Sequence, residues 1–226
     1  MSELKIFISR ISAWAPGVVS ETDWREWALG RKEISFSDKG PELSFAEPMF
    51  RRRLSQISKM TIQVVHDLMP VANDVKLLFS SFRGELSRQF QINKMIIEEK
   101  TVSPAIFSLS VFNAPVALAT IALGLKGGYS AIYIKEKSFS TALKTAEAAL
   151  LGGSAKKLIF IYADEKAQKE YECFFNEAAP AVSFALLLSK ESDMNSIPFT
   201  STAENPFDFL KQLFLLQTKM PLLYQF

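Results

Sequence analysis

The stretch SAIYIKEKSFSTALKTAEAALLGG, residues 130–153, decides the fold class of this chain. A β-branched and aromatic strand pattern at 130–134 runs through a short polar turn into an alanine-rich helix pattern that ends at two glycines. A second strand pattern, KLIFIY at 157–162, follows directly. Strand, helix and strand in this order predict an α/β layered fold with parallel pairing and helices on both faces.

The same alternation extends over most of the chain. Further strand patterns lie at 4–13, 75–80 and 181–188, and helix patterns lie at 21–29, 51–69, 85–99, 113–123 and 205–216. Residues 31–48 lose any period and contain Gly40, Pro41 and Pro48, so we expect a loop there. Because no Gly-, Pro- or Ser-rich linker divides the sequence, residues 1–226 are predicted to form one domain.

Composition excludes several classes of function. A net charge of +2 is too small for a dedicated nucleic-acid surface. The N-terminus is not typical of a signal peptide, and no apolar run reaches the roughly 20 residues that span a bilayer. One cysteine fits a reducing cytoplasm, and one cysteine with one histidine is too few for a zinc site. We therefore expect a cytoplasmic protein with no metal, no cofactor, no membrane span and no nucleic-acid partner.

Several polar features have a structural explanation beside a functional one. The glycines at 124–128, GLKGG, match neither GxGxxG nor a Walker loop and indicate a helix end and a turn. His66 lies near the end of a predicted helix, where its partial burial or the helix dipole accounts for it better than a role as a base. Cys173 stands among aromatic and acidic residues, so a buried inert thiol is favoured.

Two charged groups leave their alternatives open. Asp164, Glu165, Glu170 and Glu172 could supply a carboxylate pair for acid–base chemistry, but lysines alternate with them, which favours a solvated face. Arg51, Arg52 and Arg53 stand at a predicted helix start, where positive charge is unfavourable. Either they form a simple surface with a contact to Glu47, or they bind a phosphate or an acidic partner.

Four segments together resemble a known family. They are RRRLSQISKM (51–60), FRGEL (82–86), SPAIFSLSVFNAPVALATIALGLKGGYSAIYI (103–134) and ALLGG (149–153). In order and spacing they resemble the N-terminal half of β-ketoacyl synthases, and in particular the short ketosynthase-like proteins of type II systems that make aryl polyenes. The resemblance covers about residues 50–164. It implies a thiolase-like α/β fold: a single truncated thiolase half, with a mixed sheet covered by helices.

The resemblance also implies that catalysis is absent. The family's nucleophilic cysteine falls at or near Glu136, and the two histidines that drive decarboxylation have no counterpart, because His66 lies upstream. Relatives often carry His-Asn where this chain has Phe112 and Asn113. Claisen condensation needs an acylated nucleophile and oxyanion donors, so we expect no enzyme activity from this chain alone.

Inactive members of the family are chain-length factors, which pair with an active ketosynthase and shape its acyl or polyene tunnel. By resemblance, the strand Ser130, Ala131, Ile132, Tyr133 and Ile134 would pair across that interface, with Glu136 forming a salt bridge or capping its helix. Phe112, Asn113, Val116 and Thr120 would set the depth of the tunnel. Arg51, Arg52 and Arg53 are candidates for contact with an acyl carrier protein, which the ketosynthase could instead bind.

Two other functions stay open from the sequence. One is a scaffold that holds a ketosynthase to its carrier protein without touching the substrate. The other is an acyl hydrolase or transferase on the same fold that uses Ser138 or Ser140.

Overall fold

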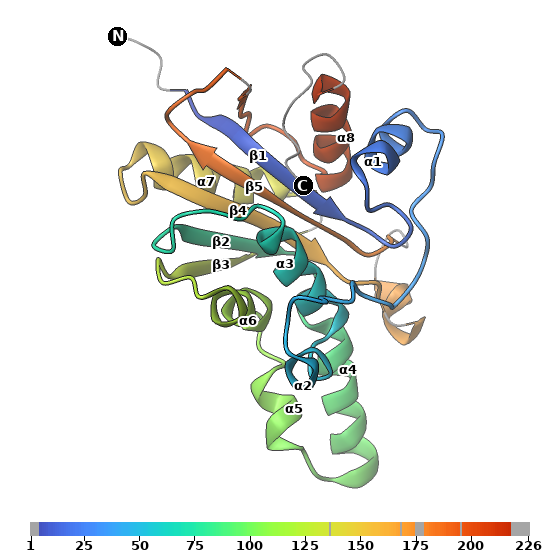
Figure 1. Ribbon diagram of the computed structural model, residues 1–226. Coiled ribbons are helices and arrows are strands. Elements are labelled where there is room, and N and C mark those ends of the chain that lie inside the picture. Colours follow the sequence, from blue (N-terminus) through green and yellow to red (C-terminus); the bar gives the residue numbers. More distant parts are fainter. Residues whose placement is uncertain (1–4, 136, 168, 175–178, 195, 218–226) are drawn as a thin grey trace.

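The computed structural model describes residues 5–217 except 136, 168, 175–178 and 195 (Figure 1). Its centre is one sheet of six strands in the order β3-β2-β4-β5-β1-β6. The strands are β1 (Phe7–Trp14), β2 (Lys76–Ser81), β3 (Tyr129–Tyr133), β4 (Lys157–Asp164), β5 (Val182–Ser189) and β6 (Ile197–Pro198). β3, β2 and β4 are parallel, whereas β5 is antiparallel to both β4 and β1. The sheet is therefore mixed, as the family resemblance predicts.

Uniform parallel pairing, expected from the alternation alone, is wrong for β5. Parallel neighbours need a crossover connection, usually a helix, that returns the chain to the starting end of the sheet. The segment between β4 and β5 holds only a short 3-10 helix, Lys169–Phe174, within its described residues. β5 consequently runs back beside β4 in the opposite direction.

Helices cover both faces of the sheet (Figure 1). They are α1 (Glu21–Ala28), α2 (Pro48–Arg51), α3 (Gln56–His66), α4 (Leu86–Lys94) with a π-helical turn (Met95–Glu99), α5 (Pro104–Ser108), α6 (Ala114–Leu123), α7 (Phe139–Leu151) and α8 (Pro206–Gln217). Side chains of β4 alternate between the faces: Phe160 packs in the core formed with α1, α7 and α8, and Ile161 packs in the core formed with α3 and α6. No helix among the described residues is long and apolar enough to cross a membrane.

The helix predicted over residues 51–69 begins later than expected. α3 starts at Gln56, and the Ser55 side chain caps it by accepting a hydrogen bond from the Ser58 N–H at 3.2 Å. Arg51 ends the short α2 and Arg52 follows as its C-cap. The arginines therefore stand at a helix C-terminus, where positive charge is favourable, and not at a helix start.

The GLKGG turn ends α6 and brings the chain to β3, as its sequence predicts. Gly124 caps α6 in the left-handed region, with φ of 65°. Gly127 passes against the chain that enters β2: a Cβ there would lie 2.1 Å from the carbonyl oxygen of Asp74 and 2.2 Å from that of Val75. Only glycine allows this approach, which fixes where β3 begins.

Gly127→Ala should therefore lower the free energy of unfolding by at least about 2 kcal/mol, because backbone atoms must move to admit the methyl group. Urea denaturation of the purified chain measures this loss. Gly40→Ala is the matched control, since a Cβ there meets side-chain atoms of Lys59 no closer than 3.1 Å. Equal losses in the two variants would contradict the proposed role of Gly127.

Candidate functional site

The turn between β3 and α7 is where the family resemblance places the lost nucleophile. Glu136, the residue predicted at that position, lies outside the described residues. Its neighbours Lys135 and Lys137 are exposed, and Lys137 has a φ of 58°. A small cavity of about 160 Å³ lies beside this turn, lined by Lys135, Lys137, Phe139, Tyr162 and Asp164 among others.

Asp164 is the most strongly bound polar group beside this cavity. Its Oδ1 accepts hydrogen bonds from the Ser81 hydroxyl at 2.6 Å and from the backbone N–H groups of Phe82 and Arg83 at 3.0 and 2.8 Å. Its Oδ2 accepts one from the Tyr162 hydroxyl. Burial and the nearby Asp164 charge raise the pKa of Tyr162 well above 10.0, so the phenol stays a donor. The carboxylate thus ties the end of β4 to the end of β2.

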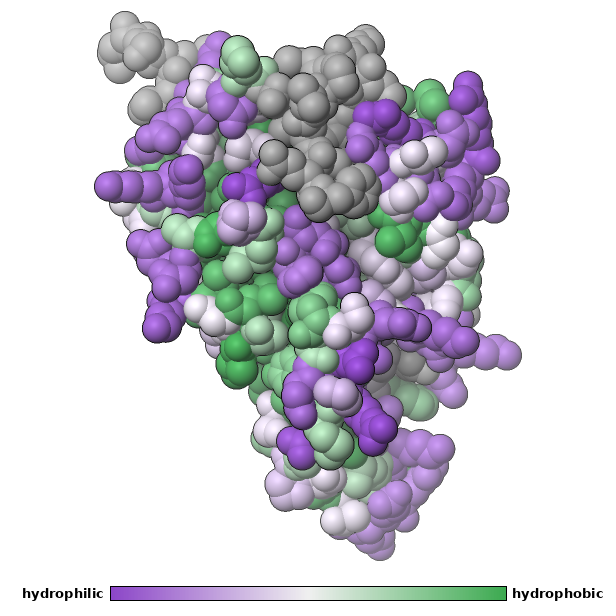
Figure 2. Space-filling model, viewed as in Figure 1, coloured by the Kyte–Doolittle hydropathy of each residue, from purple (hydrophilic) through white to green (hydrophobic). Residues whose placement is uncertain are grey.

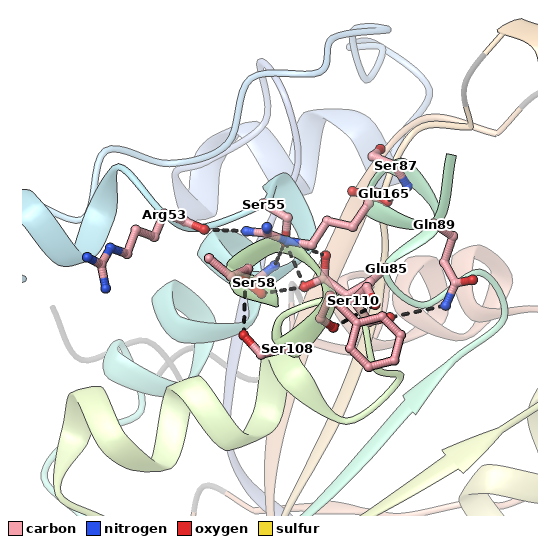
Figure 3. A network of polar contacts seen from close by, with 12 residues as sticks. Arg53, Ser55, Ser58, Glu85, Ser87, Gln89, Ser108, Ser110 and Glu165 are labelled. Carbon is pink, nitrogen blue, oxygen red and sulfur yellow. Dashed lines mark hydrogen bonds and ion pairs between the residues drawn. The ribbon is translucent and has the colours of Figure 1, made fainter. Parts of the chain in front are cut away.

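Glu85 is a second buried carboxyl group, at the start of α4 (Figure 3). It accepts hydrogen bonds from the hydroxyls of Ser55 at 2.8 Å and Ser58 at 2.6 Å, and Arg88 Nε lies 3.2 Å from its Oε2. The Arg88 guanidinium also donates to the carbonyl of Arg53. Burial raises the pKa of Glu85 above 4.5, although the hydroxyls and Arg88 favour the charged form.

Glu165, next to Asp164, is only 1% exposed. Its Oε1 accepts a hydrogen bond of 2.6 Å from the Ser87 N–H, whereas its Oε2 is buried and has no hydrogen-bond partner. Burial raises the pKa of Glu165 to about 7. The charges of Glu85 and Asp164 also raise this pKa, whereas the hydrogen bond from Ser87 lowers it. The group therefore changes its charge near neutral pH.

The solvated face predicted for the acidic cluster is wrong for two of its members. Asp164 and Glu165 are 5% and 1% exposed, and only Glu170 lies at the surface as expected. Glu172 lies in the 3-10 helix, and its side chain is outside the described part of the structure. Lysines alternate with these acids in sequence but do not pair with the two buried ones, because the strand carries Asp164 into the sheet.

Glu85 is not among the functional residues predicted from the sequence. The signal that could have found it is its place in FRGEL, directly after the buried strand β2. A carboxyl group that follows a buried strand and starts a helix tends to be desolvated, and desolvation requires polar partners. Ser55 and Ser58 are those partners, and they come from a distant part of the chain.

A cavity of about 1070 Å³ opens above the Glu85 and Glu165 network. Residues from α3, α4, α5 and α6 and from the segment after β4 line it. Arg52, Arg53 and Arg88 are among the lining residues, but Arg51 is not, because its guanidinium donates to the Glu42 carbonyl at 3.0 Å. The expected contact of the arginines with Glu47 is absent from the ion pairs of the described residues.

Three of the four residues predicted to line a tunnel, Phe112, Val116 and Thr120, differ in how far they are exposed. Val116 is fully buried in this chain's own core. Phe112 is half-buried and packs edge-on against Tyr133, with ring centroids 6.2 Å apart. Thr120 is half-buried, and its hydroxyl donates to the Ala117 carbonyl at 2.7 Å.

Asn113 stands at the N-cap position of α6, where asparagine is a favoured residue, but its side chain makes no cap hydrogen bond. Its amide instead donates to the Tyr129 hydroxyl at 3.0 Å. That bond connects the beginning of α6 to the first residue of β3. A side-chain cap does not form because Pro115 occupies the first turn and the backbone of Asn113 is not extended.

β3 is an edge strand, and a partly apolar surface surrounds it. Ile134 donates its N–H to the Ser81 carbonyl and Gly128 accepts from Leu77, so alternate residues of the strand bond to β2. The N–H groups of Tyr129, Ala131 and Tyr133 consequently point away from the sheet.

Exposed hydrophobic side chains flank this edge. We call Val111, Ile121, Tyr129 and Tyr133 the edge surface; they are 43%, 71%, 40% and 59% exposed. Figure 2 shows hydrophobic side chains gathered over the region where β3 and α6 lie in Figure 1. A bare strand edge beside apolar side chains is a site for strand pairing with another chain.

Of the remaining candidates, the two serines lie at the turn after β3, whereas His66 and Cys173 belong to other elements. His66 ends α3 on the opposite face of the sheet from α7 and stacks on Phe45, with ring centroids 3.6 Å apart. Ser140 is buried and donates to Glu204 at 2.9 Å, and Ser138 begins α7 without a side-chain cap bond. Cys173 lies in the 3-10 helix, with its side chain outside the described part. Among the residues that the structure places, no group of three or more His, Cys, Asp or Glu could hold a metal ion.

The raised pKa of Glu165 predicts a pH-dependent stability. Its folded pKa of about 7 lies above the ordinary 4.5, so the folded state holds the proton more tightly and stability falls as pH rises from 4.5 through 7. At 1.36 kcal/mol per pKa unit, the loss reaches about 3 kcal/mol. Glu165→Gln should remove this loss and should be the more stable form at pH 8.

Urea denaturation between pH 4.5 and pH 8 tests this dependence. Glu85 titrates with the same sign, so the difference between the wild type and Glu165→Gln isolates Glu165. Glu99→Gln, at an exposed position, should leave the pH profile unchanged. Parallel profiles for the wild type and Glu165→Gln would contradict the assignment.

Comparisons with known proteins agree with this geometry. The chain matches no curated protein. It is similar, at 22% identity and a TM-score of 0.75 over 94% of this chain and 92% of the other, to the structure of the ketosynthase ApeO in complex with its chain length factor ApeC from Xenorhabdus doucetiae. The ishigamide ketosynthase/chain length factor matches at 15% identity and a TM-score of 0.68, over 82% of this chain and 62% of that one.

A ketosynthase from module 1 of the bacillaene synthase of Bacillus amyloliquefaciens FZB42 also matches, at 16% identity and a TM-score of 0.60. The match covers 84% of this chain and 43% of that one, so the chain spans less than half of the bacillaene enzyme domain. These likenesses show that the fold is thiolase-like, as predicted. The model of the β-ketoacyl synthase N-terminal domain matches residues 24–209. The chain therefore belongs to the β-ketoacyl synthase N-terminal domain family.

Proposed function

We propose that this chain is a non-catalytic chain-length factor, which pairs with an active β-ketoacyl synthase and shapes its acyl tunnel in aryl polyene biosynthesis. The observation that carries the proposal is the bare edge of β3, with the edge surface beside it. Such an edge pairs readily with a strand of another chain, and a permanent partner removes the aggregation hazard. Similar structures include ketosynthases in complex with a chain length factor.

The chemistry of the turn after β3 supports a non-catalytic role. Condensation requires a thiolate there and a base or donor for the substrate carbonyl. The chain has one histidine, and α3 holds it on the opposite face of the sheet. Its one cysteine lies after β4, in the 3-10 helix. Asp164 already receives four hydrogen bonds, which suits a structural role better than proton transfer.

α6 is the element we assign to chain length. It runs beside β3 and exposes Ile121 and part of Thr120, whereas Val116 faces this chain's own core. Phe112, Asn113 and Thr120 are each partly exposed and are thus the members of the predicted tunnel set that a partner's acyl chain could reach. A polyene is rigid, so a side chain at a fixed depth would limit its length.

Arg52 and Arg53 are the two arginines suited to contact an acidic carrier protein. Both are exposed, and neither has an ion pair among the described residues. Arg51 is less suited, because its guanidinium is bound to a backbone carbonyl. In the proposed complex the carrier protein is an indirect partner, bound chiefly through the ketosynthase.

Ala131→Pro tests the strand pairing. The N–H of Ala131 points away from β2, so proline there should remove a bond to the partner while leaving the bonds to β2 intact. We expect Ala131→Pro to abolish co-purification of the ketosynthase encoded nearest to this chain, with light scattering reporting the mass of the complex. The isolated variant should lose less than about 1 kcal/mol of stability.

Ala131→Val is the matched control, because valine keeps the N–H and favours a strand. It should retain a stoichiometric heterodimer. A heterodimer of unchanged affinity with Ala131→Pro would exclude pairing through β3.

Thr120→Phe tests the chain-length role in the reconstituted complex. The larger side chain should shorten the polyene by at least one condensation cycle, as measured by mass spectrometry of the product. Thr120→Ser keeps the hydroxyl that bonds the Ala117 carbonyl and should leave product length unchanged. Normal product length with Thr120→Phe and with Thr120→Trp would favour a scaffold that does not touch the substrate.

A further inference from the structure

The cavity of about 1070 Å³ above the Glu85 and Glu165 network is lined partly by apolar and partly by polar or charged side chains. One wall is apolar and consists of Phe50, Leu54, Ala105, Ile106, Leu109 and Leu118. Leu118 comes from α6, and Ala105 and Ile106 come from the short α5. This wall is large enough to contact an aliphatic chain.

The rest of the lining is mostly polar, with more cationic than acidic side chains. It carries five cationic side chains, Arg52, Arg53, Arg88, Lys166 and Lys169, against three acidic ones, Asp38, Glu165 and Glu170. Arg88 is bound to Glu85, but the other four cations have no ion pair among the described residues. Figure 3 shows the Arg53 side chain extending away from the buried carboxyl groups. Unpaired cations around an apolar wall favour a ligand with an anionic group.

One residue that lines the cavity has a buried polar atom without a hydrogen-bond partner. Glu165 lines the cavity, and its Oε2 has neither solvent contact nor a hydrogen-bond partner. A buried polar atom without a partner costs free energy, and a ligand oxygen or N–H group that reaches it would remove that cost. With its proton, Glu165 is a donor to such an oxygen; without its proton, it is an acceptor for an N–H.

This cavity is separate from the one beside the turn after β3. The two have no lining residue in common, although Asp164 lines one and the adjacent Glu165 lines the other. Successive residues at the end of β4 thus face different cavities. A ligand above Glu165 would not occupy the position of the family's nucleophile.

We propose that this second cavity binds a small amphipathic anion, an organic phosphate or carboxylate with an aliphatic chain. The chain contacts the wall formed by Leu54, Ile106 and Leu118, and the anionic group binds the cations at the rim. The proposal does not depend on chain-length activity or on a partner.

Isothermal titration of the full chain with decyl phosphate, below its micellar concentration, tests the proposal. Inorganic phosphate lacks the aliphatic chain and decanol lacks the anionic group. Each should bind at least tenfold more weakly than decyl phosphate. Affinity should also fall as salt rises, because the rim charges are exposed. Decanoate in place of decyl phosphate distinguishes a carboxylate ligand from a phosphate ligand.

Ala105→Trp should weaken decyl phosphate binding at least tenfold by filling the cavity from an exposed position of α5. Ala148→Trp, at an exposed position of α7, is the matched control and should bind as the wild type does. Arg53→Gln should weaken binding and reduce its salt dependence. Unchanged affinity in both Ala105→Trp and Arg53→Gln, or equal affinity for decanol and decyl phosphate, would overturn the proposal. Co-purification of the ketosynthase is a separate measurement. A chain that fails to bind decyl phosphate can therefore still form the heterodimer, and a chain that fails to form the heterodimer can still bind decyl phosphate.

Discussion

The hydrogen bonds to the Asp164 carboxylate are the constraint on which the functional end of the sheet depends. They join the last residue of β4 to the last residue of β2 and to the two backbone N–H groups that follow it. A buried carboxylate is costly unless donors surround it, and hydrogen bonds to a charged group contribute more than neutral ones. Because the chain after β2 is held there, Glu85 can reach Ser55 and Ser58, and Ser87 can reach Glu165.

The hydrophobic pattern predicted most elements of the fold. The strand and helix at 130–153 appear as β3 and α7, and the loop at 31–48 continues to the start of α2. Two features depended on information that a local pattern does not hold. The direction of β5 follows from the missing crossover helix, and the start of α3 follows from the Ser55 cap, which a continuous apolar period concealed.

The candidate site was less predictable than the fold. Charge alternation around residues 164–172 is typical of a solvated face, but burial of Asp164 is decided by the length of β4 and by donors from β2. Glu85 and Ser55 meet across thirty positions of the chain, and only the folded arrangement shows this contact. The family resemblance predicted an interface along residues 130–134, and the structure places β3 at the edge of the sheet. Ser130 and Tyr133 are exposed there, whereas Ala131 and Ile132 are half-buried and Ile134 is buried in this chain's own core.

Asp164 and Glu165 also connect the two cavities physically. Arg83 uses its backbone N–H to bond the Asp164 carboxylate and its guanidinium to bond the Glu165 carbonyl at 2.9 Å. Arg83, which lines the small cavity beside β3, is therefore held to both residues at the end of β4. Since β3 itself bonds to β2 at Ser81, whose hydroxyl donates to Asp164, the same few hydrogen bonds link the large cavity to the edge strand.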